Sequence, residues 1–496
     1  MSKHIGFIKR CAVFTALLSV CFLFVWKLVT PKFFMDNDWP TTSAYCGFYE
    51  MEEESVDVLF FGSSHAASFF IPQELYNDYG YTSYNLGCEQ QNLVVSYFWL
   101  KEALRSQNPK TVVLDCYMLF TYNAKEPLNT SEACTRKALD YMKWSPVKME
   151  AVKTICELDQ NQSLLSYYLP NIRYHTRWKG LGANDFKVWE RKKHYELKGY
   201  APLAGYCGIE EFLPFDGRKA ENSAVMVPLM EEYLEKIRLL CEQQGIELLL
   251  VKNPATVQSA EKYQTVQDYA KRHGLQYFDF NEKGLYKKTE YSFASDNHDG
   301  GHGNFWGARK ITKYIGSVLK QGGRLQKKTA AQWEETKDYY MQMIKDCELP
   351  HITELNTYLA AVNNEYYSVF LATKGDWTAY LGNESAVLLR NLGLRAPESG
   401  AAAKAGFLAA VSDGKIHEQS GLEQLQLSGT VRRGIVTFLM ESTAPAYGDR
   451  CSIAVDGTEY SKNSRGLNVV VLQRETGRVI DTVCFDTGAE GRPAIR

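Results

Sequence analysis

The sequence predicts an α/β fold with a parallel sheet flanked by helices, followed by a second domain of a different kind. Residues 56–61 form a nearly continuous apolar run, which is typical of a strand buried on both faces of a parallel sheet. Strand-like and helix-like segments then alternate as far as about residue 320. From about residue 349 the pattern changes to strands separated by turn pairs such as Asp456-Gly457 and Thr476-Gly477, which predicts hairpins.

Length and composition support more than one domain and exclude some classes of function. A chain of 496 residues is too long for one ordinary hydrophobic core. The formal net charge of −2 gives no basic field for nucleic acid, so no nucleic-acid partner is expected. The twelve cysteines show no Cys-x-x-Cys pair and no zinc-like spacing, so no metal or other cofactor is predicted. Cys451 and Cys484 could form a disulfide if their strands are neighbours.

The N-terminus predicts a membrane anchor. Residues 11–26 are all apolar or small, and Lys3, Lys9 and Arg10 precede them without an acidic residue. A cleaved signal peptide is the alternative, but no small-residue cleavage site follows the run, which favours an uncleaved anchor. The positive charges keep the N-terminus cytoplasmic. We therefore expect a cytoplasmic stub and transmembrane segment over residues 1–33, in a single-pass protein of the cell membrane whose remaining chain is extracytoplasmic.

A polar connector over residues 34–54 leads into the first domain, residues 55–325. Its strands are predicted at residues 56–61, 82–87, 111–116, 246–251 and 275–280. Its helices are predicted at residues 72–79, 92–106, 228–244, 260–273 and 306–319, with a helical insert at about 120–225 that contains helices 132–142 and 147–157.

A charged helix over residues 329–345 is expected to form a linker, residues 326–348, to a second domain over residues 349–490. Strands are predicted there at residues 367–372, 435–439, 451–455, 467–472 and 479–483, with helices at 352–362 and 384–392.

Two loops of the first domain have the residue types of nucleophilic catalysis. Gly62-Ser63-Ser64 follows the first strand, where a serine hydroxyl can lie at the carboxyl end of a parallel sheet. A serine nucleophile needs a base, and the base needs an orienting acid. Asp299 and His302 supply both residue types three positions apart, just before a helix. The same loop allows two alternatives. One is a metal site built on Asp296, His298, Asp299 and His302, and the other is a triad in which His298 is the base.

Together these motifs resemble the SGNH (GDSL-like) hydrolase superfamily, and most closely its membrane-anchored, cell-envelope branch of acyltransferase-like proteins. The resemblance covers roughly residues 55–325 and implies a flavodoxin-like sheet. It implies Ser64 as nucleophile, His302 as base and Asp299 as the orienting acid, with the backbone amides of Ser64 and Gly87 as the oxyanion hole. The sequence departs from the superfamily after the third strand, where Asp115-Cys116 stands in place of an asparagine that completes that hole.

Further residues are expected to contact a substrate. Gln91 follows Gly87, and Asn304 follows His302. In the insert, Arg173, His175 and Arg177 alternate with aromatic residues. Such a cationic, aromatic segment could bind an anionic or sugar acceptor, or its basic side chains could pair with acids of the insert itself.

The C-terminal domain resembles the interleukin-like EMT inducer domain. The resemblance lies in residues 355–376 and in two runs, 460–471 and 476–487, the first of which contains Arg-Gly-Leu-Asn. It implies a β-sandwich-like core and a glycan-binding role. Arg465, Asn468 and Asp376 are candidate contacts, although turn stabilisation is the simpler role for each.

The sequence thus predicts a membrane-anchored, extracytoplasmic serine esterase or O-acyltransferase that acts on a cell-envelope or exported polysaccharide. The expected partners are this glycan, the membrane and a membrane-bound acyl carrier or transfer protein. The alternative is a non-catalytic glycan-binding or assembly protein with a degenerate SGNH domain.

Overall fold

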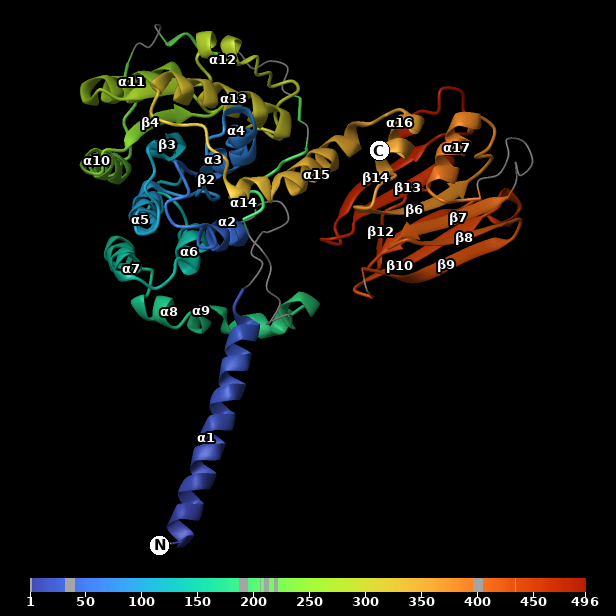
Figure 1. The fold of residues 1–496 in the computed structure, drawn as a ribbon, viewed down its shortest axis with the longest axis horizontal. Coiled ribbons are helices and arrows are strands. Elements are labelled where there is room, and N and C mark those ends of the chain that lie inside the picture. The colour runs from blue at the N-terminus through green and yellow to red at the C-terminus, as the bar shows by residue number, and fades with distance from the viewer. Residues whose placement is uncertain are drawn as a thin grey trace. The chain divides into compact units, whose positions relative to one another are not determined.

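A computed structural model of the chain describes residues 2–31, 41–186, 195–205, 207–208, 214–217, 222–395, 405–432 and 434–496. The chain divides into two compact units, Met1–Tyr340 and Met341–Arg496 (Figure 1). Each unit is described by itself.

The first unit contains a five-stranded parallel sheet in the order β2-β1-β3-β4-β5. The strands are β1 (Val58–Phe61), β2 (Ser83–Asn85), β3 (Thr111–Asp115), β4 (Glu247–Lys252) and β5 (Gln276–Asp279). This order is one of the two common orders of doubly wound sheets, and it changes direction between β1 and β3. The predicted α/β class and parallel sheet are confirmed, and all five strands lie where the apolar runs indicated.

Helices cover both faces of this sheet, because successive side chains of each strand point to opposite sides. Leu59 and Phe61 belong to the larger core, and Val58 and Phe60 belong to the core on the other face. The larger core is completed by α5 (Leu93–Ala103), α10 (Pro228–Gln243) and α11 (Ala260–His273). The other core is completed by α3 (Ser64–Phe69), α4 (Pro72–Tyr79) and α13 (Phe305–Gly322).

The N-terminal segment forms one long apolar helix, α1 (Ser2–Val29). Within it, Gly6–Val29 has a mean hydropathy of 2.2, so the helix is long and apolar enough either to span a membrane or to act as a signal sequence. Side chains along it are exposed, for example Leu17 at 61% and Leu18 at 58%.

Two parts of the first unit differ from the prediction. The expected polar connector contains a helix, α2 (Thr41–Phe48), whose Tyr45 and Phe48 are fully buried in the larger core. The charged helix at 329–345 is divided into α14 (Ala331–Glu334) and α15 (Lys337–Glu348). The Thr336 hydroxyl donates to the side chain of Gln73 and to the Gln332 carbonyl. At the break between the two helices it therefore competes with backbone amides for the Gln332 carbonyl. The first unit continues through this region as far as Tyr340.

The insert contains the two predicted helices, here α6 (Glu132–Tyr141) and α7 (Pro146–Leu158). Four short elements follow: α8 (Leu164–Tyr168), α9 (Asn171–Tyr174), and the 3₁₀ helices η2 (His175–Gly180) and η3 (Ala183–Phe186). Residues 187–194 and parts of 206–221, also predicted to belong to the insert, lie outside the described residues. A further short helix, α12 (Lys283–Thr289), precedes the loop with Asp299 and was not predicted.

The second unit is a pair of antiparallel sheets, in the orders β15-β14-β13-β6-β7-β8 and β12-β11-β10-β9. The predicted strands are present as β6 (Tyr367–Lys374), β10 (Val436–Thr443), β11 (Cys451–Val455), β13 (Gly466–Gln473) and β14 (Val479–Phe485). The sequence interpretation missed β7 (Gly406–Ser412), β8 (Lys415–Gly421), β9 (Gln424–Val431) and the two-residue strands β12 (Thr458–Glu459) and β15 (Ala494–Ile495).

The six-stranded sheet lies between two cores. Phe370 and Val470 of this sheet pack against Phe438 and Ile453 of the four-stranded sheet. Its other face packs against α16 (Leu355–Val362) and α17 (Asn383–Asn391). Cys451 and Cys484 are buried and free, and their strands belong to different sheets, so the neighbouring strands that a disulfide was expected to need are not found.

Candidate active site at the carboxyl edge of the parallel sheet

The turn after β1 places Ser64 at the carboxyl edge of the sheet, next to the point where the strand order changes direction. Gly62 has a φ of +147°, and a Cβ there would lie 2.7 Å from the Cβ of Asp115 on β3, so only glycine fits. The Ser63 hydroxyl accepts a hydrogen bond from the amide of His65 and caps α3. Ser64 is the first residue of α3 and is 7% exposed.

A short loop before α13 positions the other two predicted residues. Asn297 and Gly303 form an antiparallel bridge, and the amide of His298 donates to the carbonyl of His302 over 2.8 Å. The side chain of Asn304 then caps α13 by accepting from the amide of Gly307. The loop therefore has a fixed shape that ends in a helix cap, as the predicted helix start required.

Ser64, His302 and Asp299 form a chain of hydrogen bonds, with His302 in the middle. Nε2 of His302 lies 2.8 Å from Oγ of Ser64. Nδ1 of His302 lies 2.9 Å from each carboxylate oxygen of Asp299. The residues predicted to form a nucleophile, base and acid are thus brought together by loops 238 residues apart. These distances are within the range that proton transfer from a serine to a histidine requires.

The charges in this arrangement define the histidine tautomer. Burial opposes ionisation of Asp299, but the hydrogen bonds from His302 and from the Gly301 amide outweigh it and lower the pKa of the carboxyl. An ionised carboxylate only accepts hydrogen bonds, so Nδ1 of His302 carries the proton. Nε2 is then an acceptor for the Ser64 hydroxyl, which is the orientation that a general base requires.

A second histidine, which belongs to the Gly-Ser-Ser-His motif but was given no role from the sequence, lies directly beside these residues. His65 is 2% exposed, stacks on Tyr117 with ring centroids 4.0 Å apart, and lies 5.3 Å from the ring of His302. Burial, and then the charges of Lys252 and His302, lower the pKa of His65 well below its usual range. The ring is therefore neutral at pH 7. Its position immediately after the serine was the signal that could have drawn attention to it.

Buried polar residues from β3 and β4 support the turn that holds Ser64. The carboxylate of Asp115 accepts from the backbone amide and the side-chain amide of Asn253, at 3.1 and 3.0 Å. The side-chain amide of Asn253 also donates to the carbonyl of His65. An asparagine does reach this region, but from the end of β4 and not from the end of β3, where the SGNH pattern has one. The carbonyl of His65, in the first turn of α3, is thus held by Asn253, which Asp115 in turn positions.

Gly87 packs against the serine turn, as its predicted role requires. A Cβ on Gly87 would lie 2.9 Å from the amide nitrogen of Ala67 and 3.0 Å from the carbonyl oxygen of Ser63, so the two turns touch through backbone. Its amide, however, donates to the side-chain oxygen of Asn85 over 3.0 Å. Binding of an oxyanion by Gly87 therefore requires that this hydrogen bond be exchanged.

Gln91 and Asn304 make their hydrogen bonds within the protein. The amide group of Gln91 donates to the carbonyl of Leu86 and to the Ser96 hydroxyl, and its oxygen accepts from Tyr45. Asn304 donates to the carbonyl of Ser295 while it caps α13. Both are buried, at 2% and 0% exposure, and both have a structural role in these contacts.

The basic residues of the insert are paired, as the second of the two interpretations of that segment expected. Arg173 forms an ion pair with Glu132, and Arg177 forms one with Asp185 over 2.7 Å. His175 is exposed, with Nδ1 2.8 Å from the carbonyl of Ile172. Arg177 also donates to the carbonyl of Val29, in the last turn of α1.

The alternative uses of the Asp299 loop find less support. Among the described residues, no group of three His, Cys, Asp or Glu side chains could hold a metal ion. Asp296 is buried and forms an ion pair with Lys310. The ring of His298 lies against the backbone of Gly205, where a Cβ would come 2.2 Å from Nδ1. The contact to Ser64 is made by His302.

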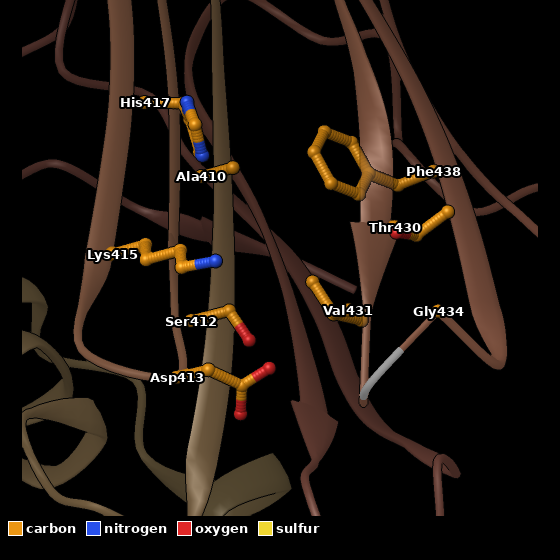
Figure 2. Close-up of a pocket in the computed structure, with 9 residues that line it drawn as sticks. All are labelled: Ala410, Ser412, Asp413, Lys415, His417, Thr430, Val431, Gly434 and Phe438. Carbon is orange, nitrogen blue, oxygen red and sulfur yellow. The ribbon is translucent and has the colours of Figure 1, made fainter.

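The polar residues considered in the second unit close its turns. Arg465 pairs with Asp486 over 2.7 Å, and both ends of the Asn468 amide bond to the backbone of Ser464. Asp376 accepts from the Thr378 hydroxyl. A separate hollow lies between β8 and β10, with Lys415 on one wall and Phe438 on the opposite wall (Figure 2). Ser412, Asp413 and His417 line the same wall as Lys415.

The chain matches no protein-family model and no curated protein sequence.

Proposed function

We propose that this protein is a membrane-anchored, extracytoplasmic serine esterase or O-acyltransferase of the SGNH type that acts on a cell-envelope or exported polysaccharide. The observation that supports it best is the 2.8 Å contact between Ser64 and His302, with the carboxylate of Asp299 on the other ring nitrogen. A serine, a histidine and an aspartate in this order form the minimal apparatus for acyl transfer.

In the proposed mechanism, the hydroxyl of Ser64 attacks the carbonyl carbon of an acyl ester while His302 accepts its proton. The ester C–O bond breaks, the alcohol leaves with that proton, and the acyl group remains on Ser64. His302 then deprotonates either water or a sugar hydroxyl, whose oxygen attacks the acyl carbon. The bond between this carbon and Oγ of Ser64 breaks, His302 returns the proton to Ser64, and the acid or the acylated sugar leaves. Asp299 keeps His302 in the required tautomer and stabilises the imidazolium that forms in each half-reaction.

The amides of Ser64 and Gly87 are the proposed donors to the oxyanion. One such donor contributes on the order of 10²–10³-fold in rate. The hydrogen bond from Gly87 to Asn85 would be exchanged for one to the developing negative charge, which is the stronger acceptor. Transfer to a polysaccharide is favoured over hydrolysis because an anchored enzyme with an additional sheet domain suits a polymeric acceptor. The acyl donor would then be presented at the membrane by an acyl carrier or transfer protein.

A fluorophosphonate probe tests the nucleophile. Such probes react with activated serines, so the wild-type chain should be labelled and Ser64→Ala should not. Ser63→Ala is the matched control, because this neighbouring hydroxyl only caps α3 and its loss should cost about 1 kcal/mol of stability while labelling persists. Absence of labelling in the folded wild-type protein would contradict the proposal.

A second assay separates transfer from hydrolysis. An acetyl ester such as p-nitrophenyl acetate is supplied as donor, with and without an added oligosaccharide. Acetylated oligosaccharide lost in Ser64→Ala supports an acyltransferase, whereas release of acetate into water alone supports an esterase.

The second candidate function is a non-catalytic glycan-binding or assembly protein. Two observations favour it: the Gly87 amide is already bonded to Asn85, and the residue directly after β3 is Cys116 and not an asparagine that could supply another donor. A folded chain that binds an oligosaccharide but neither reacts with the probe nor cleaves esters would support it.

A further inference from the structure

The insert of the first unit contacts the last turn of α1. The guanidinium of Arg177 donates to the carbonyl of Val29 over 2.8 Å. The side chain of Asn171 donates to the carbonyl of Trp26 and accepts from the Thr30 hydroxyl, at 3.3 and 3.2 Å. The final carbonyls of a helix lack partners within it, and a cation there also complements the helix dipole. The insert therefore caps the end of α1.

Burial along α1 shows where this contact lies. Large side chains from Phe7 to Val25 are 43–68% exposed, whereas Val29 is only 5% exposed. The apolar length of the helix is thus free of protein contact and its last turn is covered by η2, η3 and α9. Figure 1 shows α8 and α9 beside the end of α1. Where α1 spans a membrane, these elements must lie at the surface from which it emerges.

Residues 164–186, which comprise α8, α9, η2 and η3, are named the platform. Seven large apolar or aromatic side chains of the platform are 41–64% exposed. Single exposed apolar side chains are common on a protein surface, but a group of this size marks an interaction surface. They are Leu164, Leu165, Tyr168, Leu169, Ile172, Trp178 and Phe186. Tryptophan and tyrosine are enriched where a membrane protein meets the headgroup region, because one edge of the ring is polar and the rest is apolar.

The charges of the platform suit contact with a lipid headgroup layer better than they suit binding of an anionic sugar. Arg173 and Arg177 are neutralised by Glu132 and Asp185. Lys179 lies beside the most exposed of these aromatic rings, with Nζ 5.8 Å from the centroid of Trp178. A lysine beside a tryptophan can reach lipid phosphates while the indole enters the interface.

We propose that the platform is a membrane-contact surface that lies in the headgroup layer around the emerging end of α1. The first unit is then held at the membrane by the helix and by Trp178, Leu165 and their exposed apolar neighbours. The occupant is the lipid leaflet and not a protein partner, because the platform is continuous with the capped end of the apolar helix. This inference rests on the proposed anchored topology and is independent of the proposed catalysis.

Tryptophan quenching in nanodiscs tests the platform. The full chain is reconstituted in nanodiscs of phosphatidylcholine and phosphatidylglycerol, with or without a lipid that bears a nitroxide near its headgroup. The contribution of one indole is the difference between the wild type and a Trp→Phe variant. Trp178→Phe reports the platform, Trp26→Phe reports the end of α1, and Trp306→Phe reports α13 on the sheet. Each substitution is conservative, and Trp178 is 64% exposed, so the fold should tolerate it.

We expect the nitroxide to quench Trp178 to an extent similar to Trp26 and several-fold more than Trp306. If Trp26 is quenched and Trp178 is not, the platform does not touch lipid and is left for a protein partner, while the anchored topology stands. If neither is quenched, the topology itself fails and the inference fails with it.

Discussion

The two units use polar residues at strand ends in opposite ways. In the parallel sheet, Ser64 follows β1 and meets His302 from a loop 238 residues later in the chain. In the antiparallel sheets, the amide of Asn468 bonds to Ser464 only four residues away, and Arg465 bonds to Asp486 across the β13–β14 hairpin. These two contacts of the second unit thus join residues of a single turn or a single hairpin, although other polar contacts there, such as that between Tyr358 and Asp481, join residues 123 positions apart.

Connectivity explains this difference. Every connection between parallel strands runs back along a face of the sheet to the edge where the next strand begins. The carboxyl ends of all strands therefore lie at the opposite edge, and the loops that follow them converge there. A hairpin returns directly to its neighbour, so polar groups at its ends find partners in the same turn. We therefore expect the proposed catalytic activity to depend on the loops of the first unit. Changes in the turns of the second unit should leave that activity unaltered.

The largest expected effect comes from removing the base. His302→Ala should lower the rate constant for fluorophosphonate labelling of Ser64 by at least about 10³-fold, because the hydroxyl loses its proton acceptor. Arg465→Ala, which removes an equally well-formed contact in the second unit, should leave that rate unchanged. Equal losses in the two variants would contradict the comparison.

Two glycines with positive φ provide the next test. Gly62→Ala should lower the free energy of unfolding of the first unit by about 2–3 kcal/mol, because the new methyl group meets Asp115 in addition to the strained φ. Gly414, in the turn between β7 and β8, has a φ of +70° and open space around it. Gly414→Ala should cost only about 1 kcal/mol. Urea unfolding followed by hydrogen exchange in peptides of each unit measures both values.

Two buried asparagines separate stability from activity. Asn304→Ala and Asn468→Ala should each cost about 1 kcal/mol, since one removes a helix cap and the other removes two hydrogen bonds to a turn. Only Asn304→Ala should also slow labelling of Ser64, by about tenfold or more, because the cap fixes the loop that ends two residues after His302. Slowed labelling in Asn468→Ala would show that the units are coupled.

The smallest effect concerns acid stability. The hydrogen bond from Arg465 lowers the pKa of Asp486, so this carboxylate stabilises the fold above its unfolded pKa of about 3.9, and the contribution disappears as the pH falls through the lower folded value. Asp486→Asn should therefore lower the free energy of unfolding at pH 6, but not at a pH below the lowered folded pKa of this carboxyl. The difference should be a fraction of 1 kcal/mol, because Arg465 is half exposed. A difference that persists at acidic pH would assign the effect to packing.

The parallel sheet could be predicted because its strands have local signals, and the Ser64–His302–Asp299 contact could be predicted because two short motifs together resemble those of the SGNH superfamily. Buried parallel strands are continuous apolar runs, and a loop before a helix shows its cap in Asn304. The strands β8 and β9 were missed because most of their side chains are exposed, although Leu425 and Leu427 alternate with polar residues in the manner of a half-buried strand. Helix α2 was missed because its buried Tyr45 and Phe48 lie among small and polar residues.

The supporting residues of the site could not be read from spacing. Asn253 and Asp115 meet only because β3 and β4 are adjacent in the sheet. The apolar runs predict the strands but not the order of the strands in the sheet. The pairing of Arg173 with Glu132 likewise joins two helices of the insert that are 41 residues apart. Such contacts depend on tertiary packing and carry no local pattern.

The separation of Ser64 from His302 also has a consequence in time. At a synthesis rate of about 5–20 residues per second, roughly 10–50 s pass between the addition of the first residue and the addition of the second. During this interval the nascent chain has Ser64 but not the histidine that contacts it. In the proposed mechanism, His302 therefore cannot activate the serine until nearly all of the first unit has been made.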